Sequence, residues 1–189
     1  MINITYSAGL LGIDGYLVTV ECHSTGKLSR FEIIGLPDNA IKEAKERVKA
    51  CCVNSKLDFP DNEVVVNLAP ANMPKEGSSY DLAILMAVLK SSREIKRDVS
   101  FEDICFIGEL SLSGEIRGVR GALAMTISAK QAGKKRIFVP LQNAKEASVV
   151  DGIEVYAVKR INDVVNFLLG TKTLERSIYV PSDEELNIK

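Results

Sequence analysis

Hydrophobic and polar positions in the first part of the chain follow first a strand-like and then a helix-like spacing. Residues 17–22 and 31–34 are rich in β-branched and aromatic side chains, and a turn signal at 24–27 lies between them. This pattern predicts an antiparallel hairpin. After Asp38, a suitable helix N-cap, apolar residues recur at helical spacing and predict a helix that ends near residue 55.

The same periodicity predicts alternating strands and helices in the rest of the chain. The expected strands lie at 64–68, 104–107, 136–139 and 153–158, and the expected helices at 79–91, 122–132, 143–150 and 161–169. Ser113-Gly114 separates two short apolar segments and predicts a compact hairpin. Hairpins followed by strand–helix alternation indicate an α+β fold, a mixed α/β sandwich, over residues 1–170. Residues 171–189 lack clear periodicity and are expected to form a tail or linker.

The charge balance argues against a dedicated nucleic-acid-binding domain. The 189 residues include 24 Lys and Arg against 25 Asp and Glu, a formal net charge of −1. Proteins that bind nucleic acid through phosphate contacts are usually clearly basic, so any DNA contact must come from a local patch. No apolar run reaches the roughly 20 residues that span a bilayer, and the amino terminus lacks signal-peptide features. We therefore expect a cytoplasmic protein without membrane contact.

Metal and nucleotide sites have no sequence signature here. The four cysteines, two of them adjacent, include no Cys-x-x-Cys pair, and His23 is the single histidine. The chain lacks the Gly-x-x-x-x-Gly-Lys-Ser/Thr loop that holds nucleotide phosphates, and the glycine-rich stretches 9–12 and 114–118 are interpreted as turns. We expect reduced thiols, no metal and no cofactor in this chain.

Ser79 is the clearest candidate for nucleophilic chemistry. It follows a glycine-containing loop at the predicted start of a helix, where backbone N–H groups could hold an oxyanion. Serine needs a neighbouring base to act as a nucleophile, and it is also a preferred helix N-cap. Residue types alone therefore favour a cap at Ser79, with a nucleophile as the alternative.

Two motifs resemble those of Lon proteases. Residues 74–79, Pro-Lys-Glu-Gly-x-Ser, resemble the Lon element that carries the nucleophilic serine, and residues 108–116 resemble the hairpin that follows it in that family. In the ungapped register the general-base lysine of Lon falls on Leu123. Leucine cannot accept a proton, so the Ser–Lys dyad is broken and no enzymatic activity is expected from this chain. A Lon-like serine peptidase that uses Ser79 with an unusual base is the alternative.

A second resemblance covers nearly the whole chain. Stretches such as Ile-Gly-Leu-Pro-Asp at 34–38 are similar, in order and separation, to the amino-terminal domain of the ComM/YifB proteins, a magnesium-chelatase-like family of AAA+ ATPases. The stretches that carry the resemblance are 7–14, 34–38, 66–71, 75–82, 108–114 and 139–147. The resemblance implies a fold like ribosomal protein S5 domain 2 and the Lon proteolytic domain.

The ComM/YifB resemblance also implies a function. It implies a non-catalytic accessory domain of a homo-hexameric ATPase/helicase linked to DNA branch migration in natural transformation. An AAA+ module beyond residue 189 is expected to bind ATP and Mg. The implied partners are that module, other copies of the protein and DNA.

Two basic sets and one loop are the candidate binding surfaces. The first set shares one face of the first predicted helix and comprises Lys42, Lys45 and Lys49. The second set, around the end of a later helix, comprises Lys130, Lys134, Lys135 and Arg136. The loop residues that could line a groove are Asn67, Asn72, Lys75, Glu76 and Ser78.

Each of these surfaces also has a purely structural interpretation. The second basic set, near a helix end, can simply complement the helix dipole. Glu43 can pair with Arg47 on the first helix, which would make that face an ordinary solvated one. The loop can simply join a strand to a helix. Glu109 is expected to pair with Lys75 or with Arg117.

Overall fold

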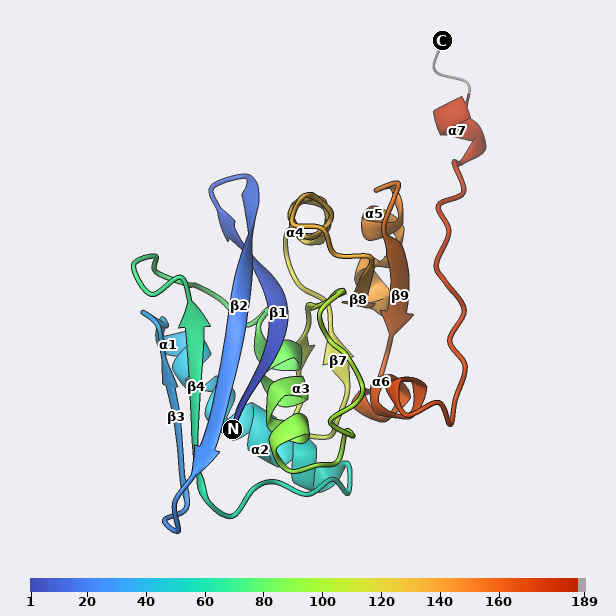
Figure 1. Cartoon of the computed structure of the whole chain (residues 1–189). Helices are drawn as coiled ribbons and strands as arrows, with labels where there is room; N and C mark the ends of the chain where they lie inside the picture. Colours follow the sequence, from blue (N-terminus) through green and yellow to red (C-terminus); the bar gives the residue numbers. More distant parts are fainter. Residues whose placement is uncertain (187–189) are drawn as a thin grey trace.

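The strands form two sheets and a short hairpin in the computed structural model, which describes residues 1–186 (Figure 1). The larger sheet has the order β1-β2-β4-β3 and consists of β1 (Ile2–Leu11), β2 (Asp14–Thr25), β3 (Arg30–Ile34) and β4 (Glu63–Ala69). The second sheet is parallel, has the order β5-β8-β9 and consists of β5 (Ile104–Phe106), β8 (Arg136–Pro140) and β9 (Glu154–Val158). The hairpin joins β6 (Glu109–Leu110) to β7 (Ile116–Arg117).

The helices cover these sheets on the sides where apolar residues point. They are α1 (Asn39–Lys42), α2 (Ala44–Asn54), α3 (Asp81–Ser91), α4 (Ala122–Gln131), the 3-10 turn η1 (Leu141–Asn143), α5 (Ala144–Ser148), α6 (Ile161–Leu168) and α7 (Asp183–Leu186). In Figure 1, α1, α2 and α3 lie behind the larger sheet, and α4 and α5 lie together at the upper end of the second sheet. All residues of α3 from Asp81 to Leu89 are buried, because this helix packs against both β1–β2 and α2.

Strand β1 lies between two hydrophobic cores. The first core fills the space between the larger sheet, α2 and α3, and extends to the stacked rings of Phe106 and Phe138. The second core, which contains Ala8 of β1, is formed by α4, α5 and the parallel strands. On its other side, β1 is tied to α3 by Thr5, whose hydroxyl donates to the Ala83 carbonyl at 2.8 Å. This position brings the end of β1 next to the start of α3.

The predicted α+β class is confirmed, but the predicted hairpin between residues 17–22 and 31–34 is wrong. Strand β2 pairs antiparallel with β1 and with β4, whereas β3 pairs parallel with β4. The turn at Gly12-Ile13 joins β1 directly to β2, so one edge of β2 is occupied by β1 and the other by β4. No edge of β2 is left for β3.

Three further local predictions need correction. The sequence predicts a turn at 9–12, but residues 9–11 belong to β1, and within this stretch only Gly12 has the positive φ, 66°, of a turn position. The turn predicted at 114–118 is also too long, because residues 116 and 117 form β7. The helix expected after Asp38 is divided at Glu43 into α1 and α2. Asp38 itself caps α1 as predicted, since its Oδ1 accepts a hydrogen bond from the Ile41 amide at 2.8 Å. The other predicted elements are present with shifts of a few residues at their ends.

The segment after α6 stays close to the second sheet. Leu174 packs against the first core, and Ser177 pairs with Val155 of β9. The short helix α7 follows. Residues 187–189, the end of the predicted tail, lie outside the described residues.

Candidate functional site

The loop before α3 lines a cavity of about 490 Å³ together with the β6–β7 hairpin and the start of α4. Its apolar lining comes from Leu10, Val119 and Met125, and its polar lining includes Ser78 and Ser79. The charged residues around it are Asp38, Glu76, Glu109 and Arg120. Segments from four distant parts of the sequence therefore meet at this cavity, which carries more acidic than basic groups.

Asp38 fixes the loop at one side of the cavity. One carboxylate oxygen caps α1, and the other accepts a hydrogen bond from the Gly77 amide at 2.9 Å. The backbone of Asp38 also donates to the Lys75 carbonyl at 3.1 Å. Gly77 has a φ of 86°, a conformation that glycine adopts without the steric cost of a side chain. A carboxylate that the sequence identifies as a helix cap thus also sets the path of the loop.

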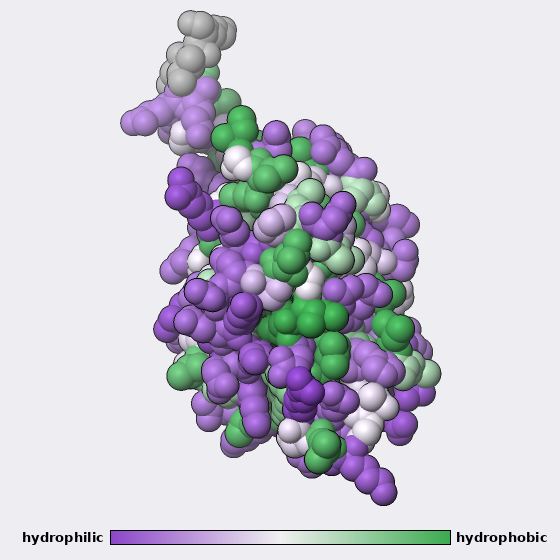
Figure 2. Space-filling model, turned by 90° about the vertical axis from the view of Figure 1, so that its left-hand side faces the viewer, coloured by the Kyte–Doolittle hydropathy of each residue, from purple (hydrophilic) through white to green (hydrophobic). Residues whose placement is uncertain are grey.

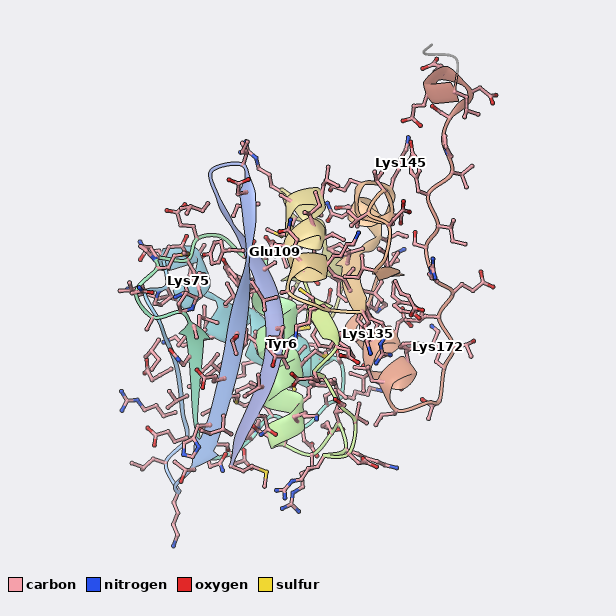
Figure 3. All side chains as sticks on the ribbon, turned by 45° about the horizontal axis from the view of Figure 1, so that its top comes forward. Tyr6, Lys75, Glu109, Lys135, Lys145 and Lys172 are labelled. Atoms are coloured by element: carbon pink, nitrogen blue, oxygen red, sulfur yellow. The ribbon has the colours of Figure 1, made fainter. Side chains whose placement is uncertain are left out.

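Lys75 is a buried structural residue rather than part of a loop surface. Its side chain has no exposed area, and its ammonium group donates to the carbonyls of Gly35, at 2.8 Å, and Pro70. Burial lowers the pKa of this amine. Because Lys75 is engaged with these carbonyls, it forms neither the predicted pair with Glu109 nor a hydrogen bond to Ser79 in the described structure. Figure 3 shows Lys75 near β3 and β4, and Glu109 nearer to α4.

Glu109 forms the other polar contact at the mouth of the cavity. It accepts a hydrogen bond from the Ser78 hydroxyl, and its other oxygen lies 3.8 Å from Nη1 of Arg117. The predicted pairing of Glu109 with Arg117 is therefore confirmed. The hydrogen bond to Glu109 places Ser78, rather than Ser79, next to a carboxylate.

Ser79 is not a helix cap, and its hydroxyl bonds to a backbone carbonyl rather than to a basic side chain. Helix α3 begins at Asp81 with Tyr80 at the N-cap position and no side-chain capping bond, so the predicted cap at Ser79 is wrong. The Ser79 side chain is 6% exposed, and its hydroxyl donates to the Ala8 carbonyl at 3.4 Å. A carbonyl oxygen does not accept a proton at neutral pH, so this contact does not activate the serine.

Helix α4 contributes a methionine to the cavity, and Leu123 lies on the outer part of that helix. Met125 lines the same cavity as Ser79, whereas Leu123 is 39% exposed. Neither side chain can take a proton. Neither Leu123 nor Met125 can therefore take the place of the lysine in the Ser–Lys dyad of Lon.

The five loop residues do not form one surface. Glu76 and Ser78 line the cavity, while Lys75 is buried. Asn67 lies on β4 and donates to Glu21 of β2 at 2.9 Å, and Asn72 is exposed in the loop. Sequence reasoning did not place Arg120 or Met125 here, because their approach depends on contacts between distant segments and leaves no local signal.

The first basic set lies along α1 and α2. Lys42 and Lys49 are exposed, and Lys49 lies 5.9 Å from the ring centre of Phe59. Lys45 is 3.9 Å from Glu32 of β3. Figure 2 shows the side of the molecule that carries β3, where hydrophobic side chains gather near the centre of a mostly hydrophilic surface.

The second basic set is divided by burial. Lys134 is 8% exposed, with its ammonium 3.2 Å from the ring centre of Tyr6 and donating to the Glu102 carbonyl, so it is not part of an exposed patch. Burial lowers the pKa of this amine. Lys135 pairs with Asp103 at 3.6 Å. Lys130 is exposed on α4, and Arg136 is partly buried at the start of β8. Figure 3 shows Lys75 and Lys135 on opposite sides of the molecule.

Metal-binding clusters and membrane-spanning helices are both absent from residues 1–186. No group of three or more His, Cys, Asp or Glu side chains in this range is arranged to hold a metal ion. Among the helices of the same range, none has the length and apolar character needed to span a bilayer.

Comparison with known proteins gives consistent relationships. A family described as subunit ChlI of Mg-chelatase matches residues 20–143. The competence protein ComM of Haemophilus influenzae is 35% identical over 97% of this chain, and YifB of Escherichia coli is 34% identical over 93%. Lon protease 2 of Bacillus subtilis is 26% identical over 66% of this chain and 22% of its own length. The chain spans about a third of ComM and YifB, 36% and 34% of their lengths.

Proposed function

This chain belongs to the magnesium-chelatase-like ComM/YifB family, and from that premise we propose that it is a non-catalytic accessory domain of a ComM-type AAA+ ATPase. The full protein would be a homo-hexameric ATPase/helicase that acts in DNA branch migration, and its AAA+ module would bind ATP and Mg. The name of the Haemophilus relative, a competence protein, supports a role connected with natural transformation. This domain would serve assembly or the engagement of DNA and partners.

The environment of Ser79 is the observation that carries the non-catalytic part of this proposal. Its hydroxyl is buried against the Ala8 carbonyl, and the Lys75 amine is held by the Gly35 and Pro70 carbonyls. A serine nucleophile requires a base within hydrogen-bonding distance to remove its proton. The oxyanion-binding potential of a helix amino terminus alone does not replace that base.

The lysines of α1 and α2 support the DNA-engaging part of the proposal. Lys42 and Lys49 are exposed, and the ion pair of Lys45 with Glu32 is long, at 3.9 Å. Surface pairs of this kind contribute little energy and are readily exchanged for phosphate contacts. The second basic set is less continuous, because the buried Lys134 lies in sequence between the exposed Lys130 and Lys135.

A peptidase assay tests the non-catalytic assignment. The chain is incubated with a fluorophosphonate serine probe and with unstructured peptide substrates, alongside the variant Ser79→Ala. We expect no labelling at Ser79 and no turnover in either protein. Turnover that disappears in Ser79→Ala would instead establish the Lon-like serine peptidase.

Fluorescence anisotropy with labelled single-stranded and four-way-junction DNA tests the DNA contact. We expect saturable binding that weakens as salt increases, and loss of most binding when Lys42, Lys45 and Lys49 are replaced by Gln. The matched control replaces Lys145, Lys159 and Lys172 by Gln, which changes the net charge equally and should preserve most of the binding. An absence of binding at low salt would assign DNA contact to other parts of the full protein.

A further inference from the structure

Helix α4 exposes apolar side chains and buries hydroxyl groups. Leu123 and Ile127 are 39% and 40% exposed, and their spacing of four residues places them on one face of the helix. Thr126 and Ser128 are buried on the inner side, where their hydroxyls donate to the carbonyls of Ala122 and Met125. These bonds within the helix satisfy the buried hydroxyls. The outward position of Leu and Ile is the reverse of the usual arrangement for a surface helix.

The turn between β1 and β2 continues this apolar surface. Leu11 and Ile13 are 64% and 90% exposed, and Ile13 lines a groove of about 260 Å³ together with Ile127. The turn and α4 lie side by side at the top of Figure 1. Gly15 permits this approach, because a β-carbon there would lie 2.2 Å from the Ala124 carbonyl oxygen. Leu11, Ile13, Leu123 and Ile127 are called the tip patch.

Opposite charges flank the tip patch. Asp14 follows Ile13 and lines the same groove. Lys130 lies three residues beyond Ile127, on the stripe that Leu123 and Ile127 form. Both side chains are exposed, and within residues 1–186 neither forms an ion pair or a side-chain hydrogen bond. The patch thus combines an apolar centre with one unpaired acid and one unpaired base.

We propose that the tip patch is a self-complementary contact through which two copies of this chain pair, with Asp14 of each copy facing Lys130 of the other. A contact of this type uses the same surface on both partners and forms each interaction twice. These charges favour a second copy of the chain as the partner, because Asp14 and Lys130 of one copy complement Lys130 and Asp14 of the other. The contact needs neither DNA nor an ATPase module.

The size of the tip patch sets the expected strength of pairing. Stable interfaces bury about 800 Å² on each partner, which four side chains do not supply alone. Pairing of this chain is therefore expected to be weak and to depend on concentration. Neighbouring copies in a hexameric ring are not related by a two-fold axis, so in the full protein the tip patch would pair copies of two different rings.

Sedimentation velocity over a wide concentration range tests the apolar centre. The chain should change from monomer to dimer as the concentration rises, whereas the double variant Ile13→Ser/Ile127→Ser should remain monomeric. The control Leu28→Ser removes an 81% exposed leucine in the turn between β2 and β3 and should pair like the unaltered chain. If the unaltered chain is monomeric at every concentration, or forms assemblies larger than a dimer, the proposal is overturned.

Charge reversal tests the orientation and does not disturb the core. Asp14→Lys and Lys130→Asp should each weaken pairing at least about tenfold, since like charges then face each other across the contact. The protein with both substitutions should regain most of the original dimerisation constant, while its melting temperature remains that of the single variants. A double variant that pairs no better than either single one would contradict the contact between Asp14 and Lys130.

Discussion

Arg47 of α2 and Asp81 of α3 form a bidentate ion pair, with Nε 2.7 Å from Oδ2 and Nη2 3.0 Å from Oδ1. Asp81 is 1% exposed, and the same carboxylate accepts a hydrogen bond from the Leu110 amide at 3.1 Å. Three elements that are distant in sequence, α2, α3 and the β6–β7 hairpin, therefore meet at one carboxylate. This contact also sets the position of Glu109 at the mouth of the cavity.

Removal of the guanidinium should strongly destabilise the fold. Arg47→Met leaves the buried Asp81 carboxylate without its counter-ion, and breaking such a pair typically costs about 3–5 kcal/mol. Urea unfolding measures the change in unfolding free energy. The control is Glu43→Gln, because Glu43 is 74% exposed and lies 3.9 Å from Arg47, so its loss should cost less than about 1 kcal/mol. Equal effects of the two substitutions would show that the contact with Asp81 is not the stabilising one.

Lys75→Met should also lower stability. The substitution removes the hydrogen bonds to the Gly35 and Pro70 carbonyls and leaves them without a donor in a buried place. An unsatisfied buried polar group costs about 1–3 kcal/mol, so we expect a loss in this range or above it in urea unfolding. Lys42→Met, at an exposed lysine, should change stability by less than about 0.5 kcal/mol. A neutral Lys75→Met would argue against a structural role for this amine.

The buried cysteines should make stability fall at alkaline pH. Burial raises the pKa of Cys51, Cys52 and Cys105 to about 12, against 9.0 for an ordinary thiol. Between these values the unfolded chain has already lost the thiol protons that the folded chain retains, so the unfolding free energy decreases as pH rises from about 9 towards 12. Urea unfolding near pH 8 and near pH 10.5 measures the decrease, and Cys105→Ala should make it smaller. An identical decrease in Cys105→Ala would exclude a contribution from that thiol.

Gly15→Ala should weaken the contact between the β1–β2 turn and α4. The added carbon would lie 2.2 Å from the Ala124 carbonyl oxygen, which belongs to the helix backbone and cannot rotate away. Overpacking of this kind costs about 1–3 kcal/mol, measured as a lower melting temperature. Gly12→Asn is the comparison, because Gly12 has no atom near its added carbon and Asn tolerates its φ of 66°. A smaller loss at Gly15 than at Gly12 would contradict the close approach.

The sequence by itself determined most of the local structure. The predicted helix at 161–169 corresponds to α6, and the hairpin at Ser113-Gly114 corresponds to β6–β7. The cap at Asp38 and the pair between Glu43 and Arg47 are present as well. Each of these features depends on residues only a few positions apart, so periodicity, capping and turn chemistry are sufficient to predict them.

The tertiary structure decided which of these elements meet. It paired β2 with β1 and β4, placed Asp81 against Arg47 and directed the Ser79 hydroxyl to Ala8. It also buried Lys75, an amine that composition alone would leave at the surface. The physical reason is that such a group becomes buried only where segments distant in sequence supply its hydrogen-bond partners, and the spacing of residues within any one segment does not record that arrangement.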